Sequence, residues 1–168
     1  MTNPDTMRDN RIINIGSDHA GFEHKEAIKE WLESEGYEVV DHGAYEYEAE
    51  DDFPDFVAPV ANAIAADPNE MGIVIGGSGQ GEAIMANRFP GVRAMVYNGQ
   101  YIPADGREVP EEIVTARQHN DANIISLGAR FLSIRESIEA VEIFLDTEFS
   151  GEERHVRRIE KIDDGYHS

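Results

Sequence analysis

Short apolar runs alternate with helical stretches along most of this chain, and that alternation constrains its fold more than any other feature. Five runs have the length and composition of buried strands: residues 11–15, 38–41, 72–75, 92–97 and 123–127. Six stretches have the apolar spacing of helices: residues 23–35, 56–66, 82–88, 111–118, 134–145 and 153–162. The pattern predicts an α/β fold, with a Rossmann-like, doubly wound, five-stranded parallel sheet sandwiched between helices.

The alternation continues without a linker or an internal repeat, so residues 1–168 are expected to form a single domain. Within it, residues 1–10 read as a polar N-terminal tail. Residues 98–110 (NGQYIPADGREVP) contain turn-forming glycine and proline, and we expect them to form a surface insertion. Ligands of doubly wound sheets bind at the carboxyl ends of the strands, so the residues that follow each strand are candidate site residues.

Composition excludes several classes of protein. The chain has no cysteine, which excludes a disulfide scaffold, a thiolate zinc site, an iron–sulfur cluster and a thiol nucleophile. Its formal net charge of −20 disfavours nucleic acid and anionic membranes as partners. No apolar run approaches the ~20 residues of a membrane helix, and the polar N-terminus does not resemble a signal peptide. We therefore expect a soluble, cytoplasmic protein that needs a local basic pocket to bind any anion.

An acid and an imidazole, Asp18 and His19, follow the first strand. Side by side at a strand tip, these groups can transfer protons to and from a sugar oxygen. Alternatively, Asp18 caps the helix that follows and His19 is a polar loop residue.

A glycine-rich loop, residues 76–82 (GGSGQGE), follows the third strand and enters a helix. Its backbone amides can hold an oxyanion or a phosphate. Two nucleotide-binding motifs do not match: Glu82 stands where G-x-G-x-x-G, counted from Gly77, needs its third glycine, and where a P-loop needs lysine. Glu82 suits a general base beside an anion-stabilising loop, or alternatively a first-turn glutamate favoured by the helix dipole.

Further polar residues flank the fifth strand and the last helix. His119 and Asn120 follow a helix and precede the strand, so they can serve a neighbouring subunit's site or simply form the helix-ending turn. Arg130 follows the strand, at its carboxyl end. Arg154 and Arg158 share one helix face, where they can bind phosphate or pair with glutamates of that helix. The histidines show no HExxH or similar spacing, so no metal site is expected.

Four segments that span most of the chain carry a family resemblance: GSDHAGFEHK at 16–25, GGSGQGEAIMANRFPGVRA at 76–94, ARQHNDANIISLGAR at 116–130 and RHVRRI at 154–159. Together, and in this order, they resemble the type B ribose-5-phosphate isomerases and their relatives that act on other sugar phosphates. The resemblance implies a homodimer, alone or paired into a tetramer, whose active sites are shared between subunits. It also implies an aldose–ketose isomerisation without metal or other cofactor, with ribose 5-phosphate and ribulose 5-phosphate as the expected pair.

The resemblance implies roles for residues in three parts of the chain. Asp18 and His119 match the pair that opens the furanose ring, and His19 lines the same pocket. Ser78 matches the cradle for the enediolate oxygens, together with the amides of the loop glycines Gly77, Gly79 and Gly81.

Four further residues match family positions that bind the phosphate or belong to the partner subunit's contribution. Asn120 matches a polar contact that the partner subunit contributes. The phosphate-binding arginines of the family correspond to Arg130, Arg154 and Arg158.

The family divides by its catalytic base. One branch uses a cysteine directly after the third strand, where this chain has Gly76, and the other uses a glutamate at the end of the glycine loop, here Glu82. Since the chain has no cysteine, Glu82 is the expected base. One carboxylate can carry the proton between neighbouring carbons through a cis-enediol, and burial near apolar walls is expected to raise its pKa.

Two departures from the family leave the substrate open. Phe53 stands where the glutamate branch usually has tyrosine, and the segment 98–110 is about ten residues longer than its counterpart. The alternative substrates are tetrose or hexose phosphates, for example galactose 6-phosphate or allose 6-phosphate. The alternative of another class is a non-catalytic sugar-phosphate binding protein, although the carboxylate of Glu82 would lower the affinity of such a protein for its ligand.

Overall fold

A computed structural model describes residues 10–165, so residues 1–9 of the expected polar tail lie outside the described residues. Five strands form one sheet: β1 (Ile12–Ser17), β2 (Glu38–Asp41), β3 (Met71–Gly76), β4 (Ala94–Tyr97) and β5 (Ile124–Gly128). Their order across the sheet is β2-β1-β3-β5-β4, and every neighbouring pair is parallel. The predicted five-stranded parallel sheet is thereby confirmed.

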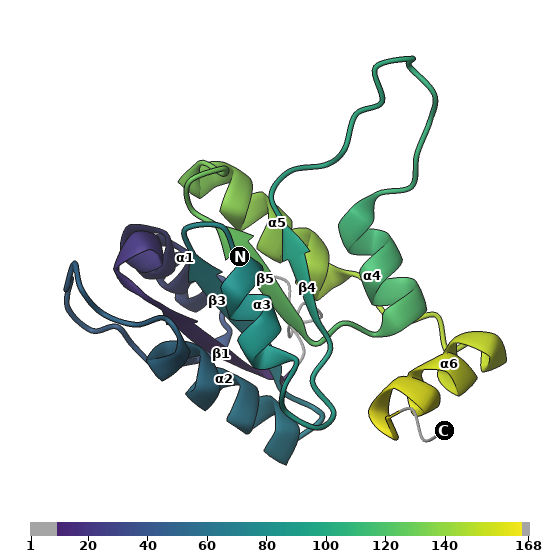
Figure 1. Cartoon of the computed structure of the whole chain (residues 1–168), viewed down its shortest axis with the longest axis horizontal. Coiled ribbons are helices and arrows are strands. Elements are labelled where there is room, and N and C mark those ends of the chain that lie inside the picture. Colours follow the sequence, from purple (N-terminus) through teal and green to yellow (C-terminus); the bar gives the residue numbers. More distant parts are fainter. Residues whose placement is uncertain (1–9, 166–168) are drawn as a thin grey trace, which may run out of the picture.

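Helices connect the strands and cover both faces of the sheet (Figure 1). They are η1 (His19–Gly21), α1 (Phe22–Ser34), α2 (Pro54–Ala66), α3 (Gln80–Ala86), α4 (Glu112–Asn120), α5 (Ile134–Asp146) and α6 (Glu153–Asp163). Helices α2 and α3 pack on one face, whereas α1 and α5 pack on the other. Helix α6 lies next to α4, on the side of the molecule where β4 forms the sheet edge (Figure 1).

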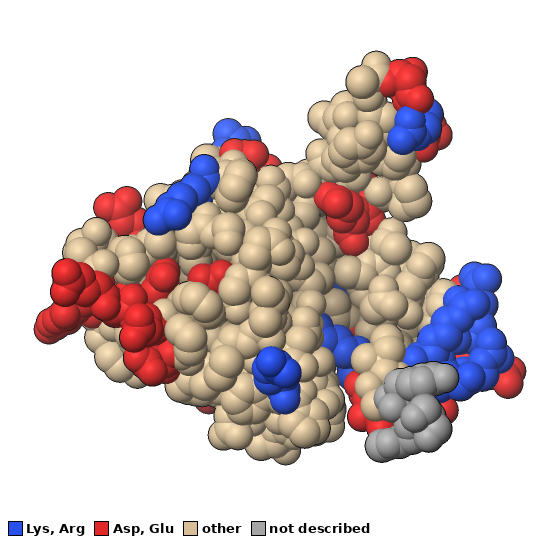
Figure 2. Space-filling view, viewed as in Figure 1, with Lys and Arg blue, Asp and Glu red and all other residues tan. Residues whose placement is uncertain are grey.

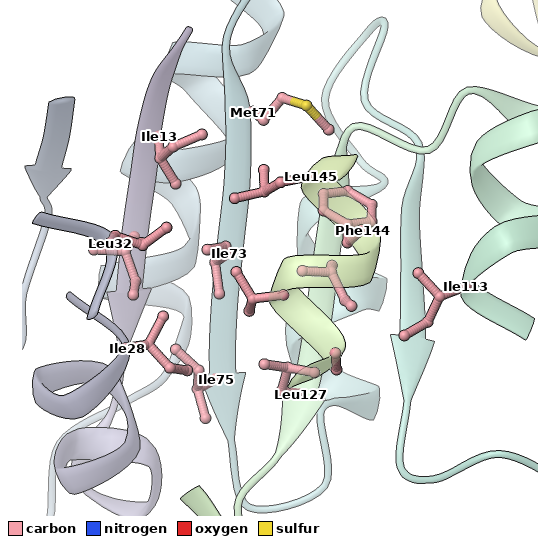
Figure 3. Close-up of a cluster of buried hydrophobic side chains, with 14 of the residues drawn as sticks. Ile13, Ile28, Leu32, Met71, Ile73, Ile75, Ile113, Leu127, Phe144 and Leu145 are labelled. Carbon is pink, nitrogen blue, oxygen red and sulfur yellow. The ribbon is translucent and has the colours of Figure 1, made fainter. Parts of the chain in front are cut away.

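The central strands are buried on both sides, which explains their uninterrupted apolar sequence. All six residues of β3 are buried, and successive side chains point to opposite faces. Ile73 and Ile75 therefore join the core beneath α1 and α5 (Figure 3), while Val74 joins the core beneath α2 and α3. A capping box between Ser133 and Glu136 fixes the start of α5.

The carboxyl ends of β1 and β3 lie side by side at the point where the strand order reverses. Ser17 in β1 is opposite Ile75 in β3, and Gly76 in β3 is opposite Gly128 in β5. The loops that follow these strands therefore begin at the same level of the sheet. Open parallel sheets bind their ligands at such a point.

Two segments between β4 and β5 bear on the site. Helix α4 extends through Asn120, so His119 and Asn120 are its last residues. The alternative in which these two residues simply form the helix-ending turn is therefore not what the structure shows. The expected helix end at residue 118 is therefore wrong: the break comes at Asp121, which takes the left-handed conformation with φ 46°. Residues 98–111 form neither helix nor strand and rise away from the body of the molecule (Figure 1). Among residues 10–165, no helix combines the length and apolar character needed to cross a membrane.

Candidate active site

Asp18 directly follows β1, and Glu82 lies in the first turn of α3, directly after the glycine loop that follows β3. Asp18 caps η1, because its Oδ1 accepts hydrogen bonds from the amides of Ala20 (3.0 Å) and Gly21 (3.3 Å). Both acids are buried, Asp18 with 7% and Glu82 with 4% of its surface exposed. Capping accounts for one oxygen of Asp18 and for neither oxygen of Glu82.

The carboxylate of Glu82 lies directly over Gly76, the last residue of β3. A Cβ atom placed on Gly76 would overlap Oε1 of Glu82. One volume can thus hold either a side chain at position 76 or the carboxylate of Glu82, but not both. This gives a physical reason why a cysteine at the position of Gly76 and a glutamate at the position of Glu82 are alternatives as the catalytic base.

The glycine loop turns its carbonyl groups away from the site. The carbonyls of residues 76, 77, 78 and 79 accept hydrogen bonds, in this order, from Ala129 N (2.8 Å), Arg130 N (3.1 Å), Asn98 Nδ2 (2.8 Å) and Ser126 Oγ (2.6 Å). Gly79 then takes a left-handed conformation, with φ 74°, that leads the chain into α3. Among residues 10–165, the amides of Gly77, Ser78 and Gly79 have no protein acceptor, so they can bind an anionic ligand.

Burial sets the protonation of both acids. It raises the pKa of Glu82 above its ordinary value, and the negative charge of Asp18 raises that pKa further, while a hydrogen bond from the amide of Glu82 itself acts in the opposite direction. Burial also raises the pKa of Asp18, although hydrogen bonds from Gly21 and Ala20 and the nearby His19 partly offset it. A buried carboxylate with a raised pKa is a stronger base once ionised, which suits proton abstraction.

His19 is held by Asp51, an acid from the loop between β2 and α2. Oδ1 of Asp51 accepts a hydrogen bond from the backbone amide of His19 (3.0 Å) and lies 2.6 Å from Nδ1 of its ring. The rings of Tyr47 and His19 form a T-shaped pair, with 6.1 Å between their centroids and 88° between their planes. The imidazole therefore sits in one defined orientation beside Asp18.

Phe53 and Arg130 border the glycine loop in the same chain. A Cβ placed on Gly81 would lie 2.7 Å from Cζ of Phe53, and one placed on Gly77 would lie 3.0 Å from Cζ of Arg130. The aromatic ring and the guanidinium group therefore pack against the loop backbone. Arg130 supplies a cation beside the loop amides, and the family departure at Phe53 lies at the site.

Four of the predicted site residues lie far from this pocket in the single chain. His119 and Asn120 end α4, at the amino edge of the sheet, and Arg154 and Arg158 are exposed on α6. Figure 2 shows Lys and Arg gathered over α6, whereas Asp and Glu gather at the opposite end of the molecule. Arg154 Nε also donates a hydrogen bond to Glu152 (2.9 Å), the residue that precedes α6. This agrees with the alternative in which the arginines pair with nearby glutamates.

A histidine stack joins α4 to α6. The rings of His119 and His155 lie 4.4 Å apart at 28°, and Nδ1 of His155 is 2.8 Å from Oγ of Ser150. Burial and the neighbouring His119 lower the pKa of His155, which favours its neutral form. The stack holds the His119 ring of α4 against α6, the helix that carries Arg154 and Arg158.

Asp18, His19 and Asp51 are also a candidate group for a metal ion. One possible ligand atom of each residue lies within 4.8 Å of the others. The contact between His19 Nδ1 and Asp51 Oδ1, however, already joins two of those residues at 2.6 Å. A hydrogen-bonded acid–imidazole pair accounts for this arrangement without a metal.

Comparison with known proteins identifies one family. A family model described as Ribose/Galactose Isomerase matches residues 13–162, a range that contains every predicted site residue. Ribose-5-phosphate isomerase B of Mycolicibacterium paratuberculosis is 41% identical over 149 residues, which cover 88% of this chain and 87% of that protein. The protein of the same name from Escherichia coli is 35% identical over 150 residues, covering 89% and 93%.

Solved structures agree with the sequence comparison. A ribose 5-phosphate isomerase from Thermotoga maritima superposes with a TM-score of 0.80 at 39% identity, covering 94% of this chain and all of that one. Ribose-5-phosphate isomerase B from Mycoplasma genitalium, solved with bound ribulose 5-phosphate, gives a TM-score of 0.80 at 36% identity, with coverage of 91% and 94%.

Proposed function

This chain belongs to the ribose/galactose isomerase family, and from that premise we propose that it interconverts ribose 5-phosphate and ribulose 5-phosphate with Glu82 as the base. The observation that carries this proposal is the buried carboxylate of Glu82, held over Gly76 beside unbonded loop amides. A protein that only binds a sugar phosphate gains nothing from a carboxylate at that place, since its charge repels the ligand.

The proposed reaction begins with ring opening by Asp18 and His119, with His19 lining the pocket. Glu82 then removes the proton from C2 of the open-chain aldose, and the electrons of that C–H bond form the C1–C2 double bond of a cis-enediolate. Ser78 and the amides of the glycine loop stabilise the negative oxygen. A proton moves from O2 to O1, and Glu82 returns its proton to C1, which gives the ketose and restores the carboxylate.

The second subunit is proposed to complete the site. Helix α3, which carries Glu82, lies over the middle of the sheet, whereas the cationic helix α6 lies beside α4 at the edge of the molecule (Figure 1). A single copy therefore does not bring Arg154 and Arg158 to the glycine loop. In a homodimer, the ends of α4 and α6 from one copy would supply His119, Asn120 and these arginines to the partner's pocket. Arg130 would bind the phosphate from the chain that carries Glu82.

Turnover of ribose 5-phosphate by the chelator-treated protein tests the function. We expect ribulose 5-phosphate to form without added metal, because the proposed steps need only side chains and backbone amides. Allose 6-phosphate, galactose 6-phosphate and a tetrose phosphate serve as comparison substrates, because Phe53, where the family usually has tyrosine, packs against the glycine loop. Faster turnover of one of these would reassign the substrate. Binding of these sugar phosphates without turnover of any would contradict the proposal that the protein is an enzyme.

The pH dependence of kcat/KM is expected to show an acidic limb set by Glu82. Only the ionised carboxylate can remove the proton, so activity falls as the pH drops through its pKa. Because burial and the charge of Asp18 raise that pKa, the limb is expected at higher pH than for a solvent-exposed glutamate. Asp18→Asn removes the second cause and is expected to move the limb to lower pH. A profile that stays flat from about pH 5 to 8 would contradict Glu82 as the base.

A further inference from the structure

The loop between β2 and α2 is strongly acidic, but one of its acids is turned inward. Glu46, Glu48 and Asp52 are exposed, whereas the side chain of Asp51 is only 11% exposed. Oδ2 of Asp51 is buried, and among the described residues it has no hydrogen-bond partner. Burying a carboxylate in this way costs stability, so its contacts with His19 call for an explanation beyond folding.

We propose that Asp51 is a positioning residue of the isomerase site, which fixes the tautomer and the direction of the His19 ring. This inference rests on the proposed function and deepens it. A carboxylate oxygen accepts hydrogen bonds and cannot donate them, so the 2.6 Å contact places a proton on Nδ1 of His19. The second hydrogen bond, from the amide of His19 to the same oxygen, fixes the acid relative to the backbone.

The consequence falls on the other ring nitrogen. With the proton held on Nδ1, Nε2 of a neutral His19 carries a lone pair that points away from Asp51. Among residues 10–165, Nε2 of His19 has no hydrogen-bond partner, so it is available to a sugar hydroxyl. The T-shaped contact with Tyr47 further restricts the tilt of the imidazole, which lies next to Asp18 in the sequence.

Asp51→Ala tests this role because it removes the oxygen that accepts from both the amide and the ring of His19. Without that acceptor, the neutral ring can carry its proton on Nε2, which would turn an acceptor for the sugar into a donor. We expect kcat/KM for ribose 5-phosphate to fall about 10- to 100-fold, the range typical of groups that orient a functional histidine. Asp52→Ala is the matched control, since it removes the neighbouring, exposed carboxylate, and it is expected to stay within about twofold of the unmodified protein.

Nitrogen-15 NMR of the histidine rings gives a readout that a merely structural role would not move. The signal of His19, assigned by its loss in His19→Gln, is expected to show protonated Nδ1 in the unmodified protein and in Asp52→Ala, and protonated Nε2 in Asp51→Ala. Protonated Nε2 in the neutral ring of the unmodified protein would overturn the proposal, as would an unchanged kcat/KM or an unchanged His19 tautomer in a folded Asp51→Ala protein. If Asp51→Ala fails to fold, the spectrum of the unmodified protein still shows whether Nδ1 carries the proton. Failure of the isomerase assay, by contrast, would count against the proposed function alone.

Discussion

Glu82→Gln is expected to lower kcat for ribose 5-phosphate by about 10²- to 10⁴-fold, the usual contribution of a positioned acid–base group. Glutamine has nearly the same shape as glutamate but cannot take the proton from C2. Substrate binding depends on the loop amides and the arginines, so KM is expected to change little. The same variant should lose the exchange of the C2 proton with deuterated water, which reports proton abstraction separately from product release.

Gly76→Ala gives an independent test of the same carboxylate. The added Cβ would overlap Oε1 of Glu82, so the carboxylate must leave its place although its charge and length are unchanged. We expect kcat to fall almost as far as in Glu82→Gln, and the double variant Gly76→Ala/Glu82→Gln to be little worse than either, because both changes remove one group. A Gly76→Ala protein with normal kcat, or strictly additive losses in the double variant, would contradict the placement of the base. Thermal melting of each variant separates loss of catalysis from loss of fold.

The central strands were predictable because burial on both faces leaves an uninterrupted apolar run in the sequence, as in β3. The edge strands β2 and β4 are only partly buried, yet each of the five predicted runs overlaps an observed strand. The boundary at residue 118 was wrong because the helix-ending residue is Asp121, whose left-handed conformation has no strong sequence signal for a residue other than glycine. The order β5 before β4 in the sheet was equally hidden, because strand pairing is a long-range choice.

The site was predictable where it follows the strands and hidden where it depends on folding. Strand ends pointed to Asp18 and to the glycine loop. The same rule applies to Asn98, which follows β4 and donates to the carbonyl of Ser78, although the sequence suggested only a loop there. Asp51 had no such signal, since it is one acid among several in its loop and only the structure shows which of them turns to His19.

The distribution of charge supports the proposal that residues of α4 and α6 act at the pocket of a second copy of the chain. A protein of net charge −20 that binds a phosphate must concentrate its cations near the ligand. Here the densest group of them lies over α6, at the side of the molecule opposite to the main group of Asp and Glu (Figure 2). Under the proposed assignment, an isolated chain holds Glu82 on α3 and Arg154 and Arg158 on α6, so one copy alone does not complete the site. In the proposed homodimer, the partner subunit would bring these arginines to the glycine loop.

Two inactive variants are therefore expected to restore activity when they pair. Glu82→Gln inactivates the pocket of its own chain, and His119→Ala inactivates the pocket of the partner. A heterodimer of the two holds one site with both changes and one with neither. Each homodimer is expected to be nearly inactive, and the heterodimer to have about half the activity of the unmodified dimer.

Coexpression with two different affinity tags allows that heterodimer to be isolated. Two further pairs serve as controls: Glu82→Gln paired with itself under both tags, and Glu82→Gln paired with Asp18→Asn, which changes a residue of the same pocket. Neither control contains an unmodified site under the proposed arrangement, so neither should recover. If His119 instead served the pocket of its own chain, the heterodimer with His119→Ala would also lack an unmodified site, and its activity would stay at the level of the two controls. Recovery specific to the pair that joins α4 of one chain to the glycine loop of the other would establish that the isomerase site is built by two subunits.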